Sequence, residues 1–120
     1  MILKEKTGIK YFTFPHLSND PYVWHGIFTR SGGCSQAPFQ SLNIGNGLGD
    51  QPQAVQQNRK LISQCVGENY IVYIAQNHGT EKHIFVKDDK SGTPNADPRS
   101  YVGDSMITNI HKKILAIQVA

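Results

Sequence analysis

Long apolar runs are missing from this 120-residue chain, and no secretion signal is visible in its first residues. No stretch is apolar over the roughly 20 residues that a membrane-spanning helix needs, and no basic start is followed by an apolar signal core. No internal repeat is visible. These absences favour a cytoplasmic protein without a membrane partner. The length allows one modest hydrophobic core, so we expect a single domain over residues 1–120.

Charge and cysteine are also scarce. The 12 lysines and arginines exceed the 9 acidic residues by a formal charge of +3, and they are spread along the chain, which argues against a nucleic-acid partner. Without a secretion signal, Cys34 and Cys65 are expected to be free thiols. Cys65 falls on the apolar side of a predicted helix and should be in the core. Cys34 would be a candidate nucleophile only if His78 lay close to it.

The first part of the chain predicts two strands and a long loop. Residues 8–14 mix β-branched and aromatic types and end at a proline, and residues 23–30 alternate in the manner of a second strand. Residues 31–50 are rich in glycine and have no sustained period, which is typical of a functional loop. The loop should pack against the domain through its apolar side chains, which are Phe39, Leu42, Ile44 and Leu48.

A helix is predicted after this loop. Asp50 is placed to be its N-cap, with Gln53 three residues later and Pro52 in the first turn, and Gly67 should end it. A stripe at helical spacing should pack on a sheet, and its members are Ala54, Val55, Asn58, Leu61, Ile62 and Cys65.

Further strands are expected at 70–76, 82–87, 101–109 and 114–120, with a polar loop at 87–100. Strands mixed with one helix, without regular βαβ units, predict an α/β (α+β) protein. The last segment is almost continuously apolar, as in a strand buried on both faces, and the sequence stops within it. We therefore expect these residues to be the front part of a larger domain.

His78 follows the predicted strand 70–76. A histidine there is most often a hydrogen-bonded structural residue, and a metal or catalytic role is the alternative. Its spacing to His83 is that of an H-x4-H half-site, but residues five apart in an extended segment point to opposite faces, so one ion would not bind both without a turn. The residues alone do not supply the three ligands of a catalytic zinc.

Arg30 and Arg59 are the candidate cations. Arg30 ends strand 23–30 at the mouth of the loop, where a guanidinium can bind a phosphate or carboxylate through two hydrogen bonds. Arg59 lies in the helix, and its alternative role is a solvated helix face. The segment 44–50, IGNGLGD, superficially suggests a phosphate loop, but its evenly spaced glycines and the Asp at the helix start favour a turn-rich lead-in to the helix.

Several short motifs occur together in this chain: T-R-x-G-G at 29–33, S-L-N-x-G at 41–45, G-D at 49–50, N-R at 58–59 and Q-x-H-G at 76–79, followed by GDSMITN and ILAIQVA. In this order and spacing, residues 25–120 resemble the YfiH/YlmD-like family. That family has been labelled multicopper polyphenol oxidoreductase (laccase), purine nucleoside phosphorylase and peptidoglycan editing factor.

The resemblance implies a mixed-sheet layered sandwich, cut short in this chain, with a zinc ion held by two histidines and one cysteine. His78 matches the first of these histidines. The family's cysteine would come just after Ala120 and the second histidine later still, and neither Cys34 nor Cys65 aligns with the missing cysteine. Asn77 and Cys34 each stand where the family usually has valine.

The chemistry implied by the resemblance is phosphorolysis of purine nucleosides, with adenosine deamination as a related activity. The implied partners are a purine nucleoside and phosphate, and the implied cofactor is zinc in preference to copper. Arg30 and Arg59 would be catalytic cations that neutralise phosphate, and Asn43 and Arg30 would bind the substrate. With one zinc ligand of three, residues 1–120 alone are expected to have little or no activity.

Three other functions stay open. A peptidoglycan-precursor editing hydrolase would use the same site on another substrate. A laccase-like polyphenol oxidoreductase is less favoured, since no copper-type His-Cys-Met set is visible. A non-catalytic binding module would need its exposed sheet edge covered by a partner, for example a second copy in a homo-oligomer.

Overall fold

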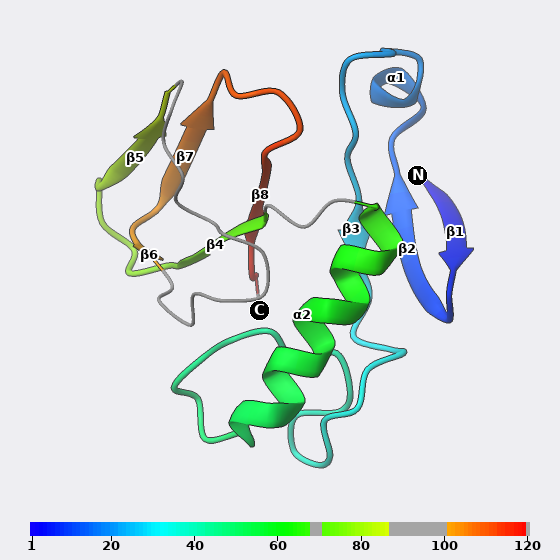
Figure 1. Ribbon diagram of the computed structural model, residues 1–120, viewed down its shortest axis with the longest axis vertical. Coiled ribbons are helices and arrows are strands. Elements are labelled where there is room, and N and C mark those ends of the chain that lie inside the picture. The colour runs from blue at the N-terminus through cyan, green and yellow to red at the C-terminus, as the bar shows by residue number, and fades with distance from the viewer. Residues whose placement is uncertain (68–70, 87–100, 120) are drawn as a thin grey trace.

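Two groups of secondary-structure elements follow one another along the chain (Figure 1). The computed structural model describes residues 1–67, 71–86 and 101–119. The first group is β1 (Ile2–Lys6), β2 (Ile9–Thr13), α1 (Pro15–Ser18), β3 (Ile27–Phe28) and α2 (Pro52–Val66). The second group is β4 (Ile71–Ala75), β5 (Lys82–Phe85), β6 (Tyr101–Val102), β7 (Ser105–Thr108) and β8 (Ile114–Ile117). This mixture of helix and small sheets confirms the predicted α/β class.

β1 and β2 form a hairpin that the sequence did not lead us to expect, since β1 lies outside the predicted strand 8–14. Its two-residue turn, Thr7-Gly8, has φ of 53° and 81°, as a type I′ turn requires. β2 alternates, with Ile9 and Tyr11 buried, whereas β1 is exposed along its whole length. The sheet order is β1-β2-β3, so β1 is an edge strand, and its charged residues discourage a further strand from pairing.

The predicted strand 23–30 is much shorter in the structure, where only the two residues of β3 pair with β2. Before β3 a side-chain contact takes the place of strand pairing. The ring Nε2 of His25 accepts the N–H of Phe14 at 2.7 Å. After β3, the carbonyl of Arg30 accepts the N–H of Ser41 at 2.8 Å and so belongs to the loop. The fully described residues 31–50 form a loop, as predicted.

Helix α2 begins at Pro52 and ends before Gly67, whose left-handed φ of 83° confirms its predicted role. The prediction that Asp50 caps the helix is wrong, since the N-cap is Gln51. The carboxylate of Asp50 turns toward the preceding loop, where Ser35 donates to it at 2.5 Å. The buried face of the helix consists of Val55, Asn58, Ile62 and Cys65.

The core lies between α2 and the strands on either side of it. As predicted, the helical stripe packs on a sheet, with α2 against β2 and Ile71 of β4 joining the same cluster. Ile9 is completely buried there, and such a side chain contributes roughly 2 kcal/mol to stability. The buried cluster consists of Ile9, Tyr11, Leu42, Ile62, Cys65 and Ile71.

The second group forms two small parallel sheets. β4 lies between β6 and β8, and β5 pairs with β7, so the strands expected at 70–76 and 82–87 are found. The single strand expected at 101–109 is wrong, because β6 pairs with β4 whereas β7 pairs with β5. Gly103 and Asp104 make the transition, with the Gly103 N–H bonded to the carbonyl of Ala75.

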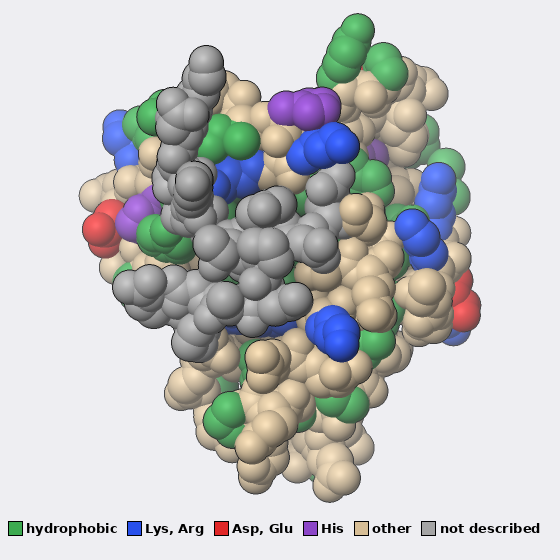
Figure 2. All heavy atoms as spheres, in the orientation of Figure 1, with side chains coloured by type: hydrophobic (Ala, Val, Ile, Leu, Met, Phe, Trp, Pro, Cys, Tyr) green, Lys and Arg blue, Asp and Glu red, His purple; other side chains and the backbone are tan. Residues whose placement is uncertain are grey.

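The structure confirms the predicted strand within 114–120, which is β8, but not the predicted burial of its two faces. Three of its residues, Ile114 to Ala116, are half-buried and Ile117 is 45% exposed, because β8 pairs with β4 along one edge and faces an open hollow on another side. The polar loop predicted at 87–100 lies outside the described residues. In the described ranges no helix is long and apolar enough to cross a membrane. Figure 2 shows lysine and arginine side chains at separate positions on the visible face.

Candidate functional site

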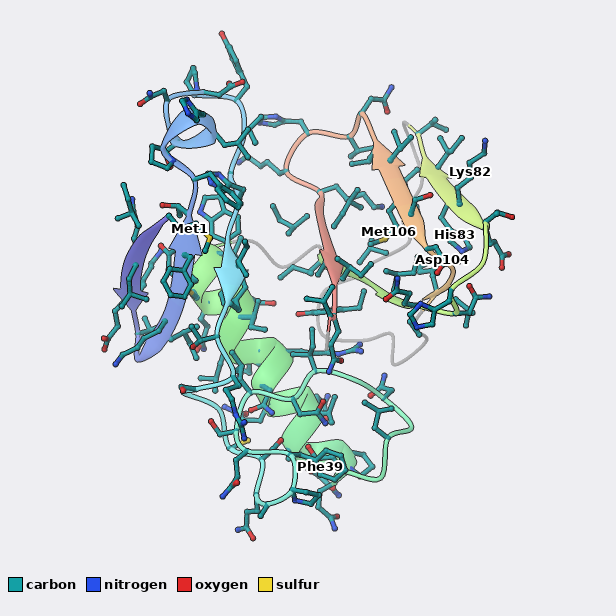
Figure 3. All side chains as sticks on the ribbon, turned by 180° about the vertical axis from the view of Figure 1, so that it is seen from behind. Met1, Phe39, Lys82, His83, Asp104 and Met106 are labelled. Carbon is teal, nitrogen blue, oxygen red and sulfur yellow. The ribbon has the colours of Figure 1, made fainter. Side chains whose placement is uncertain are left out.

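An open hollow of about 1730 Å³ lies between the β3 segment and β8. Seen from behind, these two strands flank the space (Figure 3). Its walls are largely apolar and include Trp24, Phe28, Ile62 and Ile114. Arg30 and Asn43, two of the residues predicted as functional, line this hollow together, whereas the described lining includes neither His78 nor Arg59. The hollow therefore brings together Arg30 and Asn43, whereas Arg59 lies behind its wall, bonded to the lining residue Ile44, and His78 is not part of it.

Arg30 is held at the mouth of the loop by its own backbone and by one side-chain bond. Its Nε donates to the carbonyl of Gln40 at 3.0 Å, and its carbonyl accepts N–H groups from Ser41 and Leu42. Within the described part of the chain, its two terminal amino groups have no hydrogen-bond partner. An exposed guanidinium fixed at Nε, with both terminal groups available, is suited to bind an anion through two hydrogen bonds.

Asn58 is the centre of a polar cluster that the sequence did not reveal, since it was assigned simply to the helical stripe. It is completely buried, and its Oδ1 accepts the N–H of Cys34 at 2.8 Å. Its Nδ2 donates to Ser35 Oγ at 2.8 Å and to the carbonyls of Ser41 and Asn43 at 3.1 and 2.8 Å. One α2 side chain thus fixes four loop residues, and we call these five residues the Asn58 cluster.

Asn43 joins this cluster to Asp50. Its Oδ1 accepts the N–H of Gly45 at 3.1 Å, and its Nδ2 donates to the Asp50 carboxylate at 3.1 Å. Hydrogen bonds from Ser35, Asn43 and the Gln51 N–H lower the pKa of Asp50 and outweigh the opposing effect of burial. The S-L-N-x-G and G-D motifs are therefore adjacent in space, and they shape the loop next to Arg30.

Arg59 is half-buried, so the interpretation as a solvated helix face is wrong. Its Nε and Nη2 donate to the carbonyl of Ile44 at 2.9 and 2.8 Å, and its guanidinium carbon lies 4.1 Å from the centre of the Tyr73 ring. Burial lowers the pKa of Arg59 and raises the pKa of Tyr73 to about 12. Arg59 thus links α2, the loop and β4.

Both cysteines are free thiols, as expected. Cys65 is 1% exposed and belongs to the core, where burial raises the pKa of its thiol. Cys34 is exposed, and its Sγ lies 3.3 Å from Asn58 Oδ1 and 3.5 Å from the carbonyl of Ala54. The described hydrogen bonds of its thiol are all to α2, so the structure does not pair Cys34 with His78 as nucleophile and base.

His78 follows β4 in an exposed turn and has a left-handed φ of 59°. Its N–H donates to Oδ1 of Asp104 at 2.7 Å, and the N–H of Gly79 donates to Oδ2 at 2.7 Å. We call these three residues the Asp104 clamp. His83 lies nearby, but its Nε2 contacts the carbonyl of Val102 at 2.7 Å. The two histidines therefore have separate partners, as their spacing suggested.

The donor groups around His78 do not make a complete zinc site. In residues 1–67, 71–86 and 101–119, no three His, Cys, Asp or Glu side chains are grouped to hold a metal ion. Asp104, the acidic residue beside His78, already accepts two backbone N–H groups. A catalytic zinc needs three protein ligands, so these residues alone do not fit such an ion.

Comparison with known proteins places this arrangement in a family. A family model described as multi-copper polyphenol oxidoreductase laccase matches residues 24–120, and the chain belongs to this family. It is 34% identical to a purine nucleoside phosphorylase of Corynebacterium glutamicum over 77% of this chain and 36% of that protein. It is 35% identical to one of Mycobacterium tuberculosis over 59% of this chain and 32% of that protein.

Solved structures confirm the YfiH/YlmD resemblance. YlmD from Geobacillus stearothermophilus superposes with a TM-score of 0.74 at 25% identity, over 95% of this chain and 42% of that chain. The Bacillus licheniformis protein YfiH gives a TM-score of 0.66 at 26% identity, over 77% and 36%. The chain spans 36% of the length of the Corynebacterium relative.

Proposed function

We propose that the complete protein is a purine nucleoside phosphorylase acting on inosine and adenosine, with adenosine deamination as a related activity, and that residues 1–120 form the N-terminal part of its single domain. The names of the relatives support the activity. The observation that carries the proposal is Arg30, which lines the hollow and has both terminal amino groups unpartnered among the described residues. A cation of this kind is suited to bind the phosphate that phosphorolysis consumes.

In phosphorolysis an oxygen of phosphate forms a bond to C1′ of the ribose while the bond from C1′ to the base nitrogen breaks. The base leaves with the electron pair and takes up the proton that the phosphate gives up, relayed through water. In this proposal Arg30 binds and orients the phosphate. Asn43 donates one N–H to Asp50, which leaves its second N–H for the substrate. Arg59, fixed on Ile44, adds positive charge to the same loop.

His78 is proposed as one imidazole ligand of zinc in the complete protein, with the other ligands supplied by residues beyond those described. Its support is the Q-x-H-G motif and the exposed position after β4. The family description names copper, and zinc is the proposed metal because the ligand set that the resemblance implies, two histidines and one cysteine, is of the nitrogen and sulfur type that zinc binds. On this basis residues 1–120 alone should show little or no turnover.

The test is phosphate-dependent conversion of inosine to hypoxanthine and ribose 1-phosphate by the complete protein. Arg30→Ala should raise the KM for phosphate about tenfold or more, because it removes charge-assisted hydrogen bonds. Lys60→Ala is the matched control, since it removes an exposed cation of α2 and should leave this KM unchanged. Equal KM values in Arg30→Ala and the parent protein would contradict the assignment of Arg30.

The same assay separates other activities. Turnover that proceeds equally well without phosphate would contradict phosphorolysis and indicate a hydrolase. The family description gives a specific reason to test polyphenol oxidation, by oxygen uptake with an electron-rich phenol. Oxygen uptake without any nucleoside turnover would favour that second function. Efficient inosine phosphorolysis by residues 1–120 alone would contradict the proposed need for the rest of the protein.

A further inference from the structure

Trp24 is the one tryptophan in residues 1–120, and much of its side chain stays open to solvent. The side chain is 41% exposed and lines the hollow on the side of β3. Tryptophan is on average a highly buried residue, because its ring is large and mostly apolar. An indole left open on the wall of a hollow is therefore suited to contact a ligand.

Aromatic contacts hold the indole in place from behind. Its ring centre lies 5.9 Å from that of Tyr11 and 6.1 Å from that of Phe28. Tyr11 itself belongs to the buried cluster of the core. Gly26 leaves room for the indole, because a Cβ at this position would lie 2.9 Å from Cη2 of Trp24. A ring that is fixed before a ligand arrives loses little conformational freedom on binding.

The charges along the hollow favour an anionic ligand. Among the described residues, the lining carries Arg30 after β3 and Lys112 and Lys113 before β8, and it contains no Asp or Glu. Positive groups on the wall of a concave and largely apolar site attract anions. Trp24 and Arg30 come from the same short segment, residues 24–30, which suits a planar apolar ligand bound beside an anion.

We propose that the indole of Trp24 is the surface on which the purine base of the nucleoside stacks, next to the phosphate bound by Arg30. This inference rests on the proposed function and extends it to recognition of the base. Aromatic side chains bind nucleobases by stacking, and loss of the ring typically weakens binding about tenfold or more. A purine offers two fused rings to the indole and a pyrimidine only one, so Trp24 would also favour purine nucleosides.

The first test observes Trp24 directly in the complete protein by fluorine NMR, with 5-fluorotryptophan in place of tryptophan. The Trp24 signal is identified as the one that disappears in Trp24→Phe. Inosine should shift this signal in a saturable way, because a base stacked on the indole changes its magnetic environment. Ribose 1-phosphate, which has no base, is the matched ligand and should shift the signal much less. This measurement reads binding and does not depend on turnover.

The second test separates the base from the phosphate by kinetics. Trp24→Leu should raise the KM for inosine about tenfold and leave the KM for phosphate unchanged, the opposite of Arg30→Ala. Trp24→Phe keeps a stacking ring and should recover part of the loss. Phe14→Leu is the matched control, since Phe14 is 39% exposed but is not in the described lining of the hollow. If Trp24→Leu fails to fold, Trp24→Phe replaces it, with a smaller rise in the same KM expected.

The outcomes separate this inference from the proposed function. A Trp24 signal that stays unshifted at inosine concentrations well above the KM would overturn the stacking role, because the indole would then be covered by other parts of the protein or face no ligand. Equal KM values for inosine in Trp24→Leu and the parent protein would also overturn it. A saturable shift without any inosine turnover would contradict the phosphorylase activity and support the purine subsite. Neither shift nor turnover would overturn both.

Discussion

The Asn58 cluster and the Asp104 clamp both restrain the backbone through one polar side chain, in two different environments. In each, one side chain holds backbone groups that are distant in the sequence. Asn58 is completely buried and makes hydrogen bonds to four loop residues, whereas Asp104 is half-buried and binds two N–H groups of one turn. The first therefore fixes a loop against α2, whereas the second restrains a single turn.

The chemistry of each residue fits its place. A neutral amide both donates and accepts, so it can be buried at little cost when all its groups are paired. A buried carboxylate would lose the hydration of its charge, whereas one near the surface keeps much of it. The buried amide should therefore matter far more for stability than the partly exposed carboxylate.

The largest expected effect is that of Asn58→Ala. It leaves the Cys34 N–H and the Asn43 carbonyl without their partner, so the free energy of unfolding should fall by about 3 kcal/mol. Urea unfolding followed by circular dichroism measures this loss. Gln56→Ala, on the exposed side of the same helix, should change stability by less than about 0.5 kcal/mol and controls for helix propensity. Equal losses of stability in the two variants would contradict a stabilising role of the Asn58 hydrogen bonds.

Tyr73 tests whether pairing, rather than burial alone, makes a polar group stabilising. Its hydroxyl is buried and has no hydrogen-bond partner in the described ranges, while its ring lies under Arg59. Tyr73→Leu should lower stability by about 2 kcal/mol through lost packing and cation–π contact. Tyr73→Phe keeps the ring and removes the unpaired hydroxyl, so it should raise stability by up to about 1 kcal/mol. A destabilised Tyr73→Phe would contradict the unpaired hydroxyl.

Asp50 extends the comparison to pH. Its pKa is lower in the folded protein, so its carboxylate stabilises the fold above the unfolded-state pKa of about 4. This contribution is lost as the pH falls through the lower, folded-state pKa. The urea midpoint of the parent protein should therefore fall more between pH 6 and pH 3 than that of Asp50→Asn. Identical pH dependence in the two proteins would show that Asp50 contributes nothing.

The smallest expected change in global stability is that of Asp104→Asn, at about 1 kcal/mol or less, because the clamp is half-buried and the turn that it holds is exposed. The same urea experiment measures it beside Asn58→Ala. A loss as large as that of Asn58→Ala would show that the clamp supports the fold as strongly as the buried cluster does.

The sequence predicted the elements whose formation depends on local residue patterns. Apolar spacing located α2, and glycine-rich composition located the loop 31–50. The partners of Asn58 and Asp104 were not predictable, because these side chains act over 15 to 26 positions and a local pattern carries no record of such contacts. The same limit explains the error at Asp50, whose side chain binds Ser35 in the loop rather than capping the helix.

The short strands show a second limit. Residues 101–109 read as one strand because both parts are apolar, but they pair in different sheets, and the break depends on the partners β4 and β5. The Q-x-H-G motif identified His78 in the sequence, whereas its left-handed backbone and its Asp104 partner are seen only in the structure.

The two free thiols give this protein a pair of internal reporters. Cys34 is exposed, so a thiol reagent reaches it in the folded protein, and its reaction rate reports the surroundings of the thiol in the loop. Cys65 is sealed in the core, so its modification requires much larger unfolding. Labelling one sample over time therefore gives two modification rates, that of Cys34 for the loop beside Arg30 and that of Cys65 for unfolding of the whole domain.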